Sequence, residues 1–128
     1  MDKSYSEWDF DVVVIGAGGA GLRAAIEASS NGAKVGMISK SMLGKAHTVM
    51  AEGGAAAALA NKDHRDSWKI HFRDTMKGGK YLSDWRMAKV HAQQAPDRIR
   101  ELEQWGAVFD RTSEGKASQR NFGVHTYP

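Results

Sequence analysis

Cysteine is absent from the 128 residues, which excludes disulfide bonds and thiolate metal sites and suits a reducing compartment. Long apolar runs are also lacking: no stretch reaches the roughly 18 apolar residues that a membrane-spanning helix requires. The N-terminus has acidic residues where a secretory signal needs positive charge, namely Asp2, Glu7, Asp9 and Asp11. We therefore expect a cytoplasmic chain, for which any membrane association comes through a partner.

Charge of one sign is not concentrated anywhere along the chain. The 18 basic residues stand among 15 acidic ones, and the formal net charge is +3. The two signs alternate, as in the segment 62–66, which reads Lys-Asp-His-Arg-Asp. Such mixing is typical of a solvated surface and argues against a nucleic-acid partner. The hydrophobic share of 41% predicts one domain with its own core.

Glycine is gathered into two signals in the first half of the chain. The first reads Gly16-x-Gly18-x-x-Gly21, with Gly19 in the same loop, between an apolar run and a helical pattern. Gly16 permits a tight turn, Gly18 lets the backbone approach a pyrophosphate, and Gly21 allows close helix–strand packing. The N-terminus of the following helix supplies N–H groups and positive potential. Because strand and helix flank it, the fingerprint favours nucleotide binding over a ligand-free glycine turn.

The segments around this fingerprint form one strand–helix–strand unit of about 30 residues. Residues 10–15 are typical of a strand buried on both faces of a parallel sheet. A helix is expected over 22–28, stopped by Asn31-Gly32, before a second strand over 34–39. The sequence thus predicts an α/β, Rossmann-like dinucleotide unit. Two parallel strands leave unpaired edges and uncovered faces, so we expect the fold to be incomplete in this chain.

Further along the chain the pattern is mainly helical. Asp84 is expected to cap one helix, with Trp85, Ala88 and Ala92 facing inward, and Pro96 to begin the next. The turn at 113–115 is expected to join two short strands. The expected elements are helices over 53–60, 67–76, 84–94 and 96–105, and strands over 107–110 and 116–119.

The fingerprint also predicts an acidic residue roughly 20 positions on, where it binds the ribose hydroxyls. Ser39 and Lys40 stand there instead. Ser39 keeps a hydroxyl for the ribose, whereas Lys40 suits a phosphate. A plain NAD site is therefore disfavoured, and NADP stays open as a minor alternative.

The second glycine signal reads His-Thr-Val-Met-Ala-Glu-Gly-Gly over 47–54. Thr48 offers a hydroxyl, and Gly53-Gly54 lets the backbone come close to a flat ring. The helix expected from residue 53 would stabilise negative charge on a reduced flavin. A lone loop histidine is usually a surface residue, so spacing alone assigns no chemistry to His47.

Residues 44–54, Gly-Lys-Ala-His-Thr-Val-Met-Ala-Glu-Gly-Gly, resemble the flavin-attachment segment of succinate dehydrogenase and fumarate reductase flavoprotein subunits. The likeness covers nearly the whole chain and continues in the stretches 71–79, 95–97, 102–107 and 118–123. It is a likeness to the opening part of a protein several times longer. It therefore implies that residues 1–128 are the N-terminal part of an FAD-binding domain.

The resemblance also implies a site. His47 would carry FAD covalently through a ring nitrogen, which raises the flavin potential toward that of the succinate/fumarate couple. Phe122 matches an aromatic residue beside the bound dicarboxylate, and Glu52 lies near flavin and substrate; these two are the expected catalytic residues. The expected cofactor-binding residues are Gly16, Gly18, Gly19, Gly21, Ser39, Lys40, His47, Thr48, Gly53 and Gly54.

The implied activity is that of an oxidoreductase of electron transport and the tricarboxylic acid cycle. A hydride passes between the dicarboxylate and flavin N5, and an iron–sulfur subunit carries the electrons onward. Membrane anchor subunits would place the complex on the inner face of the membrane, with this flavoprotein peripheral and cytoplasmic. The proton-handling arginine of the family falls beyond residue 128, so the 128 residues alone are expected to be inactive.

Two alternatives stay open. One is a soluble relative with non-covalent FAD, such as an L-aspartate oxidase, which His47 disfavours. The other is a non-catalytic nucleotide-binding fragment. No metal is expected, because the remaining histidines show no ligand spacing and have no cysteine partners: His64, His71 and His91.

Several further residues bear on the site. Val124 departs from the family, which reads glycine after Phe122-Gly123, and some members have glutamine at Glu52. Asp74 either positions the flavin segment or pairs with a surface lysine. His125 is either at the pocket edge or a plain surface residue. The tryptophans expected to serve in packing are Trp68, Trp85 and Trp105.

Overall fold

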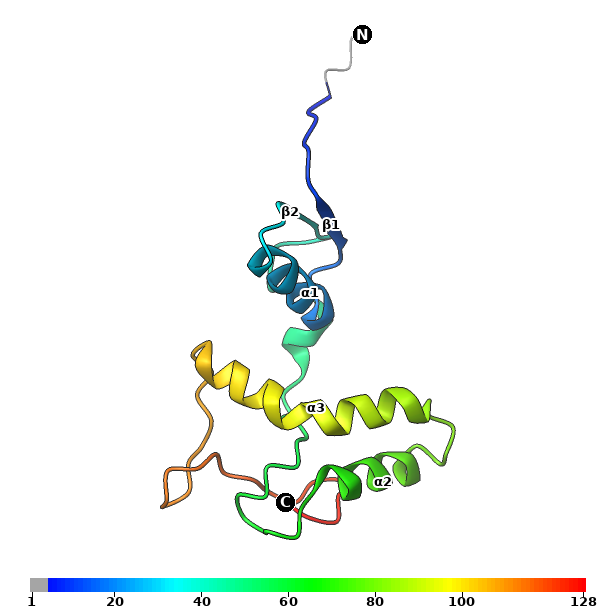
Figure 1. Cartoon of the computed structure of the whole chain (residues 1–128), viewed down its shortest axis with the longest axis vertical. Helices are drawn as coiled ribbons and strands as arrows, with labels where there is room; N and C mark the ends of the chain where they lie inside the picture. Colours follow the sequence, from blue (N-terminus) through cyan, green and yellow to red (C-terminus); the bar gives the residue numbers. More distant parts are fainter. Residues whose placement is uncertain (1–4) are drawn as a thin grey trace. The chain divides into compact units, whose positions relative to one another are not determined.

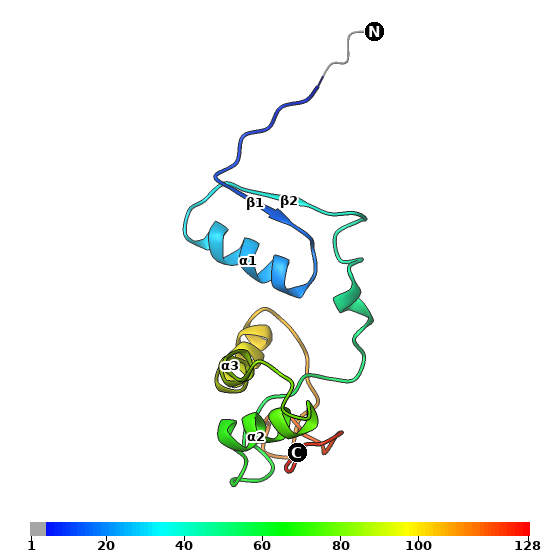
Figure 2. The ribbon, with the colours of Figure 1, turned by 90° about the vertical axis from the view of Figure 1, so that its right-hand side faces the viewer.

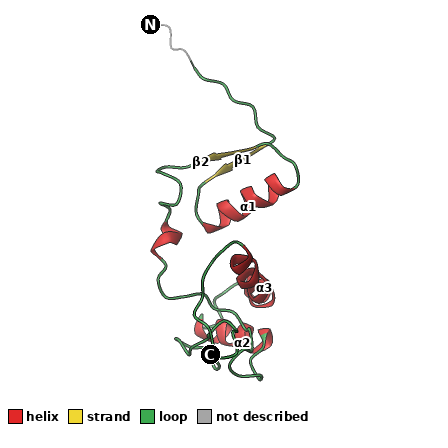
Figure 3. Ribbon diagram, turned by 90° about the vertical axis from the view of Figure 1, so that its left-hand side faces the viewer, coloured by secondary structure: helices red, strands yellow, loops and turns green. Residues whose placement is uncertain are grey.

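The structure is a computed structural model that describes residues 5–128 (Figure 1). The chain divides into two compact units, Met1–Gly54 and Ala55–Pro128, each of which is described by itself. The elements in chain order are β1 (Val12–Ile15), α1 (Gly19–Ser30), β2 (Val35–Ile38), the short 3-10 helix η1 (His47–Met50), α2 (Trp68–Gly78) and α3 (Trp85–Gln104) (Figure 3). Within residues 5–128, no helix is long and apolar enough to cross a membrane.

The first unit contains the predicted strand–helix–strand arrangement. Strands β1 and β2 pair in parallel, with Val12 opposite Val35 and Ile15 opposite Ile38. Helix α1 connects them and lies along the strand pair (Figure 2). It ends at the predicted Asn31-Gly32 stop, where Gly32 has a φ of +87° that glycine adopts without strain. The predicted Rossmann-like unit is therefore confirmed.

The faces of the two-stranded sheet are uncovered within the described residues, as expected from the sequence, although residues 10–15 have the pattern of a strand buried on both faces. The side chains of Val13 and Ile15 are 51% and 82% exposed, and Ile38 of β2 is 57% exposed. The physical reason is that the described sheet has two strands, and α1 lies along only this pair. The apolar, β-branched sequence of a doubly covered strand is present, but the cover is not within these residues.

The second unit is built on the packing of α2 against α3 (Figures 1 and 3). As predicted, α2 follows Ser67, and Asp84 caps α3 by accepting a hydrogen bond from the N–H of Arg86 at 2.8 Å. The buried residues of α3 recur at helical spacing along one face: Ala88, Ala92, Ala95 and Ile99. Small side chains on this face allow the two helices to approach closely.

Two details of α3 differ from the prediction. The helix runs without a break through Pro96, although proline has no N–H to donate and was expected to begin a new helix. Ala92 and Ala95 before the proline and Ile99 after it are all buried, so packing of one continuous face outweighs the lost hydrogen bond. Trp85, predicted to face inward, is 54% exposed.

Three further elements were predicted wrongly. No helix forms over 53–60, where the carbonyl of Ala57 accepts a hydrogen bond from the Gln119 side chain and Ala60 has a φ of +55°. Strands do not form over 107–110 and 116–119; one antiparallel bridge joins Arg111 and Ala117. The Asn61 side chain donates to the Ala117 carbonyl at 2.9 Å. The side-chain amides of Gln119 and Asn61 thus donate to backbone carbonyls that would accept backbone hydrogen bonds in a helix or sheet.

Candidate functional site

The glycine loop, residues 16–18, connects the end of β1 to the start of α1. The N–H of Gly16 donates to the carbonyl of Ile38 at 2.8 Å, and Gly16 has a φ of +107°, a conformation in which only glycine is unstrained. A Cβ added to Gly21 would fall on the backbone carbonyl oxygen of Gly16. Gly16 and Gly21 are therefore required by the chain itself, for the turn and for the close approach of helix to strand.

The N-terminus of α1 follows this loop, and the short helix η1 contacts it. Gly18 occupies the N-cap position and offers no side chain to the free N–H groups. The N–H of Gly19 instead donates to Thr48 Oγ1 at 3.0 Å, across 29 positions of sequence. This hydrogen bond brings η1, and with it His47, to the predicted phosphate-binding loop. The two glycine signals of the sequence thus meet in one place.

At Gly18 the question is whether the chain itself or a bound ligand requires glycine. A Cβ added there would meet Thr48 Oγ1 at 3.4 Å and Ala46 Cβ at 3.9 Å, both ordinary contacts. Nothing in the chain therefore requires glycine at this position. A close approach of backbone to a pyrophosphate does require it, and helix N–H groups with positive potential suit that anion.

The remaining predicted cofactor residues belong to the same unit as this loop. Ser39 and Lys40 directly follow β2, whose end is hydrogen-bonded to the start of the loop. His47 is exposed, as are Glu52, Gly53 and Gly54, and Gly54 has a φ of +99°. No helix begins at residue 53, so the predicted stabilisation of a reduced flavin by that helix is wrong.

Phe122 belongs to the second unit, whereas Glu52 belongs to the first. The Phe122 ring is 61% exposed, and the Arg120 guanidinium lies 5.3 Å from its centroid. The tryptophans of this unit that were predicted to pack are only partly covered: Trp105 is 50% exposed and Trp68 is half-buried.

Asp74 does not pair with a lysine, which was one of the two roles predicted for it. It is 3% exposed and accepts hydrogen bonds from the N–H of Thr126 at 2.7 Å and from Thr126 Oγ1 at 3.1 Å. The neighbouring Arg73 also donates to it at 3.0 Å, and no lysine is involved. Although burial raises its pKa, the hydrogen bonds from Thr126 and Arg73 outweigh this and hold the pKa of Asp74 below its ordinary value. Sequence spacing carried no signal for Thr126, which lies 52 positions away.

His71 is the second buried polar residue of this unit. Its ring packs edge-on against His91 and against His125, with 5.3 Å between centroids in each pair. Burial lowers the pKa of His71, as do His91 and His125, while Asp66 and Asp74 oppose the change. His125 is thus half-buried and packs against His71 of α2. Within the described residues, no group of three or more such side chains has metal-binding geometry.

We expect acid to destabilise the fold through His71. The unfolded chain takes up a proton near the ordinary pKa of 6.5, whereas the folded chain does so only at lower pH. The free energy of unfolding should therefore fall as pH drops below 6.5, by at most about 1.4 kcal/mol per pH unit for one proton. Urea unfolding of the native protein from pH 7.5 to 5 measures this slope. His71→Gln should flatten it and the exposed-residue control His64→Gln should not; equal slopes in both variants would contradict the assignment.

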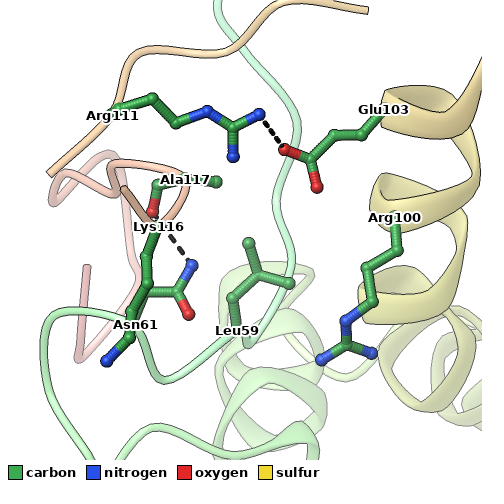
Figure 4. Close-up of a pocket in the computed structure, with 7 residues that line it drawn as sticks. All are labelled: Leu59, Asn61, Arg100, Glu103, Arg111, Lys116 and Ala117. Carbon is green, nitrogen blue, oxygen red and sulfur yellow. Dashed lines mark hydrogen bonds and ion pairs between the residues drawn. The ribbon is translucent and has the colours of Figure 1, made fainter. Parts of the chain in front are cut away.

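The second unit also has a hollow of about 260 Å³ (Figure 4). Its cations are already paired, Arg111 with Glu103 at 2.6 Å, Arg100 with Asp97 at 2.8 Å and Lys116 with Glu114 at 2.9 Å. Its lining residues are Leu59, Asn61, Arg100, Glu103, Arg111, Lys116 and Ala117. With the charges neutralised by these acids, the hollow has a structural rather than an anion-binding character.

Comparison with known proteins agrees with this geometry. The succinate dehydrogenase flavoprotein subunit of Rickettsia bellii is 47% identical over 128 residues, 98% of this chain and 21% of that protein. A fumarate reductase (CoM/CoB) subunit of Methanothermobacter marburgensis is 47% identical over 121 residues, 94% of this chain and 22% of that protein. One chain of the Mycobacterium smegmatis Sdh1 complex in the apo form has 67% identity and a TM-score of 0.89, over 93% of this chain and 20% of that chain.

The chain thus spans about a fifth of the length of the relatives it matches. Residues 11–128 also match the family described as the FAD binding domain. This match favours FAD over NADP, the alternative that Lys40 had kept open. Since it runs from the residue before β1 to residue 128, the chain belongs to the FAD binding domain family.

Proposed function

We propose that residues 1–128 are the N-terminal part of the FAD-binding domain of a succinate dehydrogenase or fumarate reductase flavoprotein subunit. The observation that carries the proposal is the hydrogen bond from Gly19 N–H to Thr48 Oγ1 at 3.0 Å. It joins the dinucleotide fingerprint to the segment that resembles the flavin-attachment sequence. The names and identities of the relatives support the same assignment.

In this proposal each part of the first unit has a role toward FAD. The N–H groups at the start of α1 hold the pyrophosphate, with Gly18 and Gly19 giving close backbone approach. Ser39 and Lys40 contact the nucleotide end, and Thr48, Gly53 and Gly54 line the flavin. His47 bonds FAD covalently through a ring nitrogen; its exposure leaves the ring accessible to such a partner.

The reaction is the interconversion of succinate and fumarate. Bound FAD would supply flavin N5 as the hydride acceptor or donor for the dicarboxylate, and the proton would be transferred separately. Phe122 contacts the dicarboxylate through its exposed ring, and Glu52 lies near flavin and substrate. The two electrons pass to an iron–sulfur subunit, and membrane anchor subunits hold the complex at the inner face of the membrane with this flavoprotein on the cytoplasmic side.

An L-aspartate oxidase-like protein with non-covalent FAD is the competing function. The histidine at position 47 and the succinate dehydrogenase and fumarate reductase names of the relatives favour the covalent family. The third alternative is a short nucleotide-binding protein without catalysis. The mass and the flavin content of the denatured protein distinguish these three functions.

The expected result is a denatured mass far above 14.0 kDa, with flavin absorbance on the same peak, for the protein purified from its native source. A heavy protein that loses its flavin on denaturation would point to the aspartate oxidase alternative. A mass near 14.0 kDa without flavin would contradict the proposal and favour the non-catalytic one.

A further inference from the structure

Three residues of α2 lie on one face of that helix at spacings of three and four: His71, Asp74 and Gly78. Each of them meets a residue of the segment 122–126, the Phe122 loop, which lies more than 40 positions further along the chain. The loop begins at the exposed Phe122 and has no regular secondary structure. Its position must therefore come from such contacts.

The central contact is made by a buried charge. Asp74 receives both the N–H and the hydroxyl of Thr126, and Arg73 Nη2 donates to Thr126 Oγ1 at 2.8 Å. A carboxylate that is 3% exposed is costly unless its oxygens are satisfied. Thr126 donates to both oxygens, so a loop that left α2 would take away two hydrogen bonds of the carboxylate and leave Arg73 as its remaining partner.

The second contact depends on the absence of a side chain. A Cβ added to Gly78 would lie 2.8 Å from Val124 Cγ2, closer than real atoms approach. Val124 therefore packs directly against the backbone of α2.

The third contact is between rings. His125 packs edge-on against the buried His71, which is itself packed against His91 of α3. Three consecutive loop residues, 124–126, are thus held by one helix face. Gly123 beside them has a φ of +61° and turns the chain between this anchored part and Phe122.

We propose that the α2 face of His71, Asp74 and Gly78 sets the position of Phe122 at the dicarboxylate, with Asp74 as a positioning residue. The inference rests on the proposed function, in which Phe122 contacts the substrate. The face does not touch the substrate; it acts through Thr126, Val124 and His125. Loosening it should weaken substrate binding more than it slows turnover.

Gly78→Ala separates positioning from stability. Alanine favours the helix over glycine, so the melting temperature should hold or rise, while the new methyl group displaces Val124. We expect the KM for succinate to rise about fivefold with kcat and flavin content nearly unchanged. Adding Val124→Gly should remove the clash and return the KM to that of Val124→Gly alone. Steady-state kinetics of the native protein with its partners measures both.

Asp74→Asn and the pair Thr126→Ser and Thr126→Val test the charged contact. Serine keeps the hydroxyl and should behave as wild type, whereas Asp74→Asn and Thr126→Val should raise the KM, by up to about tenfold for the loss of hydrogen bonds to a charge. Asp97→Asn is the matched control, because it breaks an exposed ion pair of α3 at 2.8 Å. Amide hydrogen exchange of residues 120–127 should rise in Asp74→Asn and not in Asp97→Asn.

A wild-type KM in both Gly78→Ala and Asp74→Asn would overturn the proposal, as would a Gly78→Ala/Val124→Gly double variant whose KM stays above that of Val124→Gly alone. A native protein that does not turn over dicarboxylates would contradict the proposed function instead. In that case amide hydrogen exchange of residues 120–127 still tests whether the α2 face holds the loop. Unchanged exchange in Asp74→Asn would show that it does not.

Discussion

Replacing His47 with alanine is expected to abolish denaturation-resistant flavin while leaving FAD bound to the folded protein. The pyrophosphate contacts proposed for Gly18 and Gly19 do not involve the imidazole, so binding should persist. Flavin fluorescence on a denaturing gel should fall from about one flavin per chain to none. The total flavin of the native protein, measured by absorbance before denaturation, should fall far less.

The same variant should lose succinate oxidation more than fumarate reduction. The covalent bond is proposed to raise the flavin potential, and each fall of about 30 mV in a two-electron couple costs a factor of about ten in the equilibrium constant. Steady-state rates in both directions measure the asymmetry. His64→Ala is the control, since His64 is another exposed histidine outside the flavin segment. Flavin that still resists denaturation in the His47 variant would refute the attachment site.

The second large effect is a contrast between two glycines three positions apart. Gly21→Ala should lower both stability and FAD content, because the new Cβ falls on the carbonyl oxygen of Gly16 and forces helix and strand apart. Gly18→Ala should lower FAD content alone, because its Cβ meets only Thr48 Oγ1 at 3.4 Å and Ala46 at 3.9 Å. Clashes of this kind cost about 1–3 kcal/mol, which is a factor of about 5 to 150 in FAD affinity for Gly18→Ala.

Melting temperatures of the flavin-free proteins and flavin content of the purified proteins separate the two effects. Gly32→Ala serves as a control for a loss of stability that leaves the fingerprint intact, because a φ of +87° strains alanine although no atom lies within 4 Å of the Cβ position; it should melt earlier and keep its flavin content. Unchanged flavin content in Gly18→Ala would count against the fingerprint as a pyrophosphate site. A Gly18→Ala protein that also melts early would show that the chain, and not the ligand, requires this glycine.

Elements whose cause is local were predicted well from the sequence. The strand pair, the helix after the fingerprint, its Asn31-Gly32 stop and the Asp84 cap all depend on neighbouring residues, and all are present. The same holds for the turn at 113–115, where Gly115 has a φ of +79°. Glycine conformations and caps are properties of a few adjacent residues, so a linear pattern is enough to find them.

Predictions failed where a distant residue competes for the backbone. The alanine-rich segment near Ala57 is not helical because Gln119 binds its carbonyl, and Pro96 does not break α3 because buried neighbours on both sides keep the helix intact. The exposure of Val13 and Ile15, by contrast, agrees with the uncovered sheet faces expected for two parallel strands.

For the site, the sequence by itself determined the chemistry: glycines at a helix N-terminus for a pyrophosphate, and the His47 segment through its resemblance to a flavoprotein family. Only the tertiary structure decided which of these groups meet. It placed Thr48 on Gly19 across 29 residues and Thr126 on the buried Asp74 across 52. The reason is physical: a hydrogen bond of a buried or helix-terminal group takes whichever partner the fold brings within about 3 Å, and sequence distance has no part in that choice.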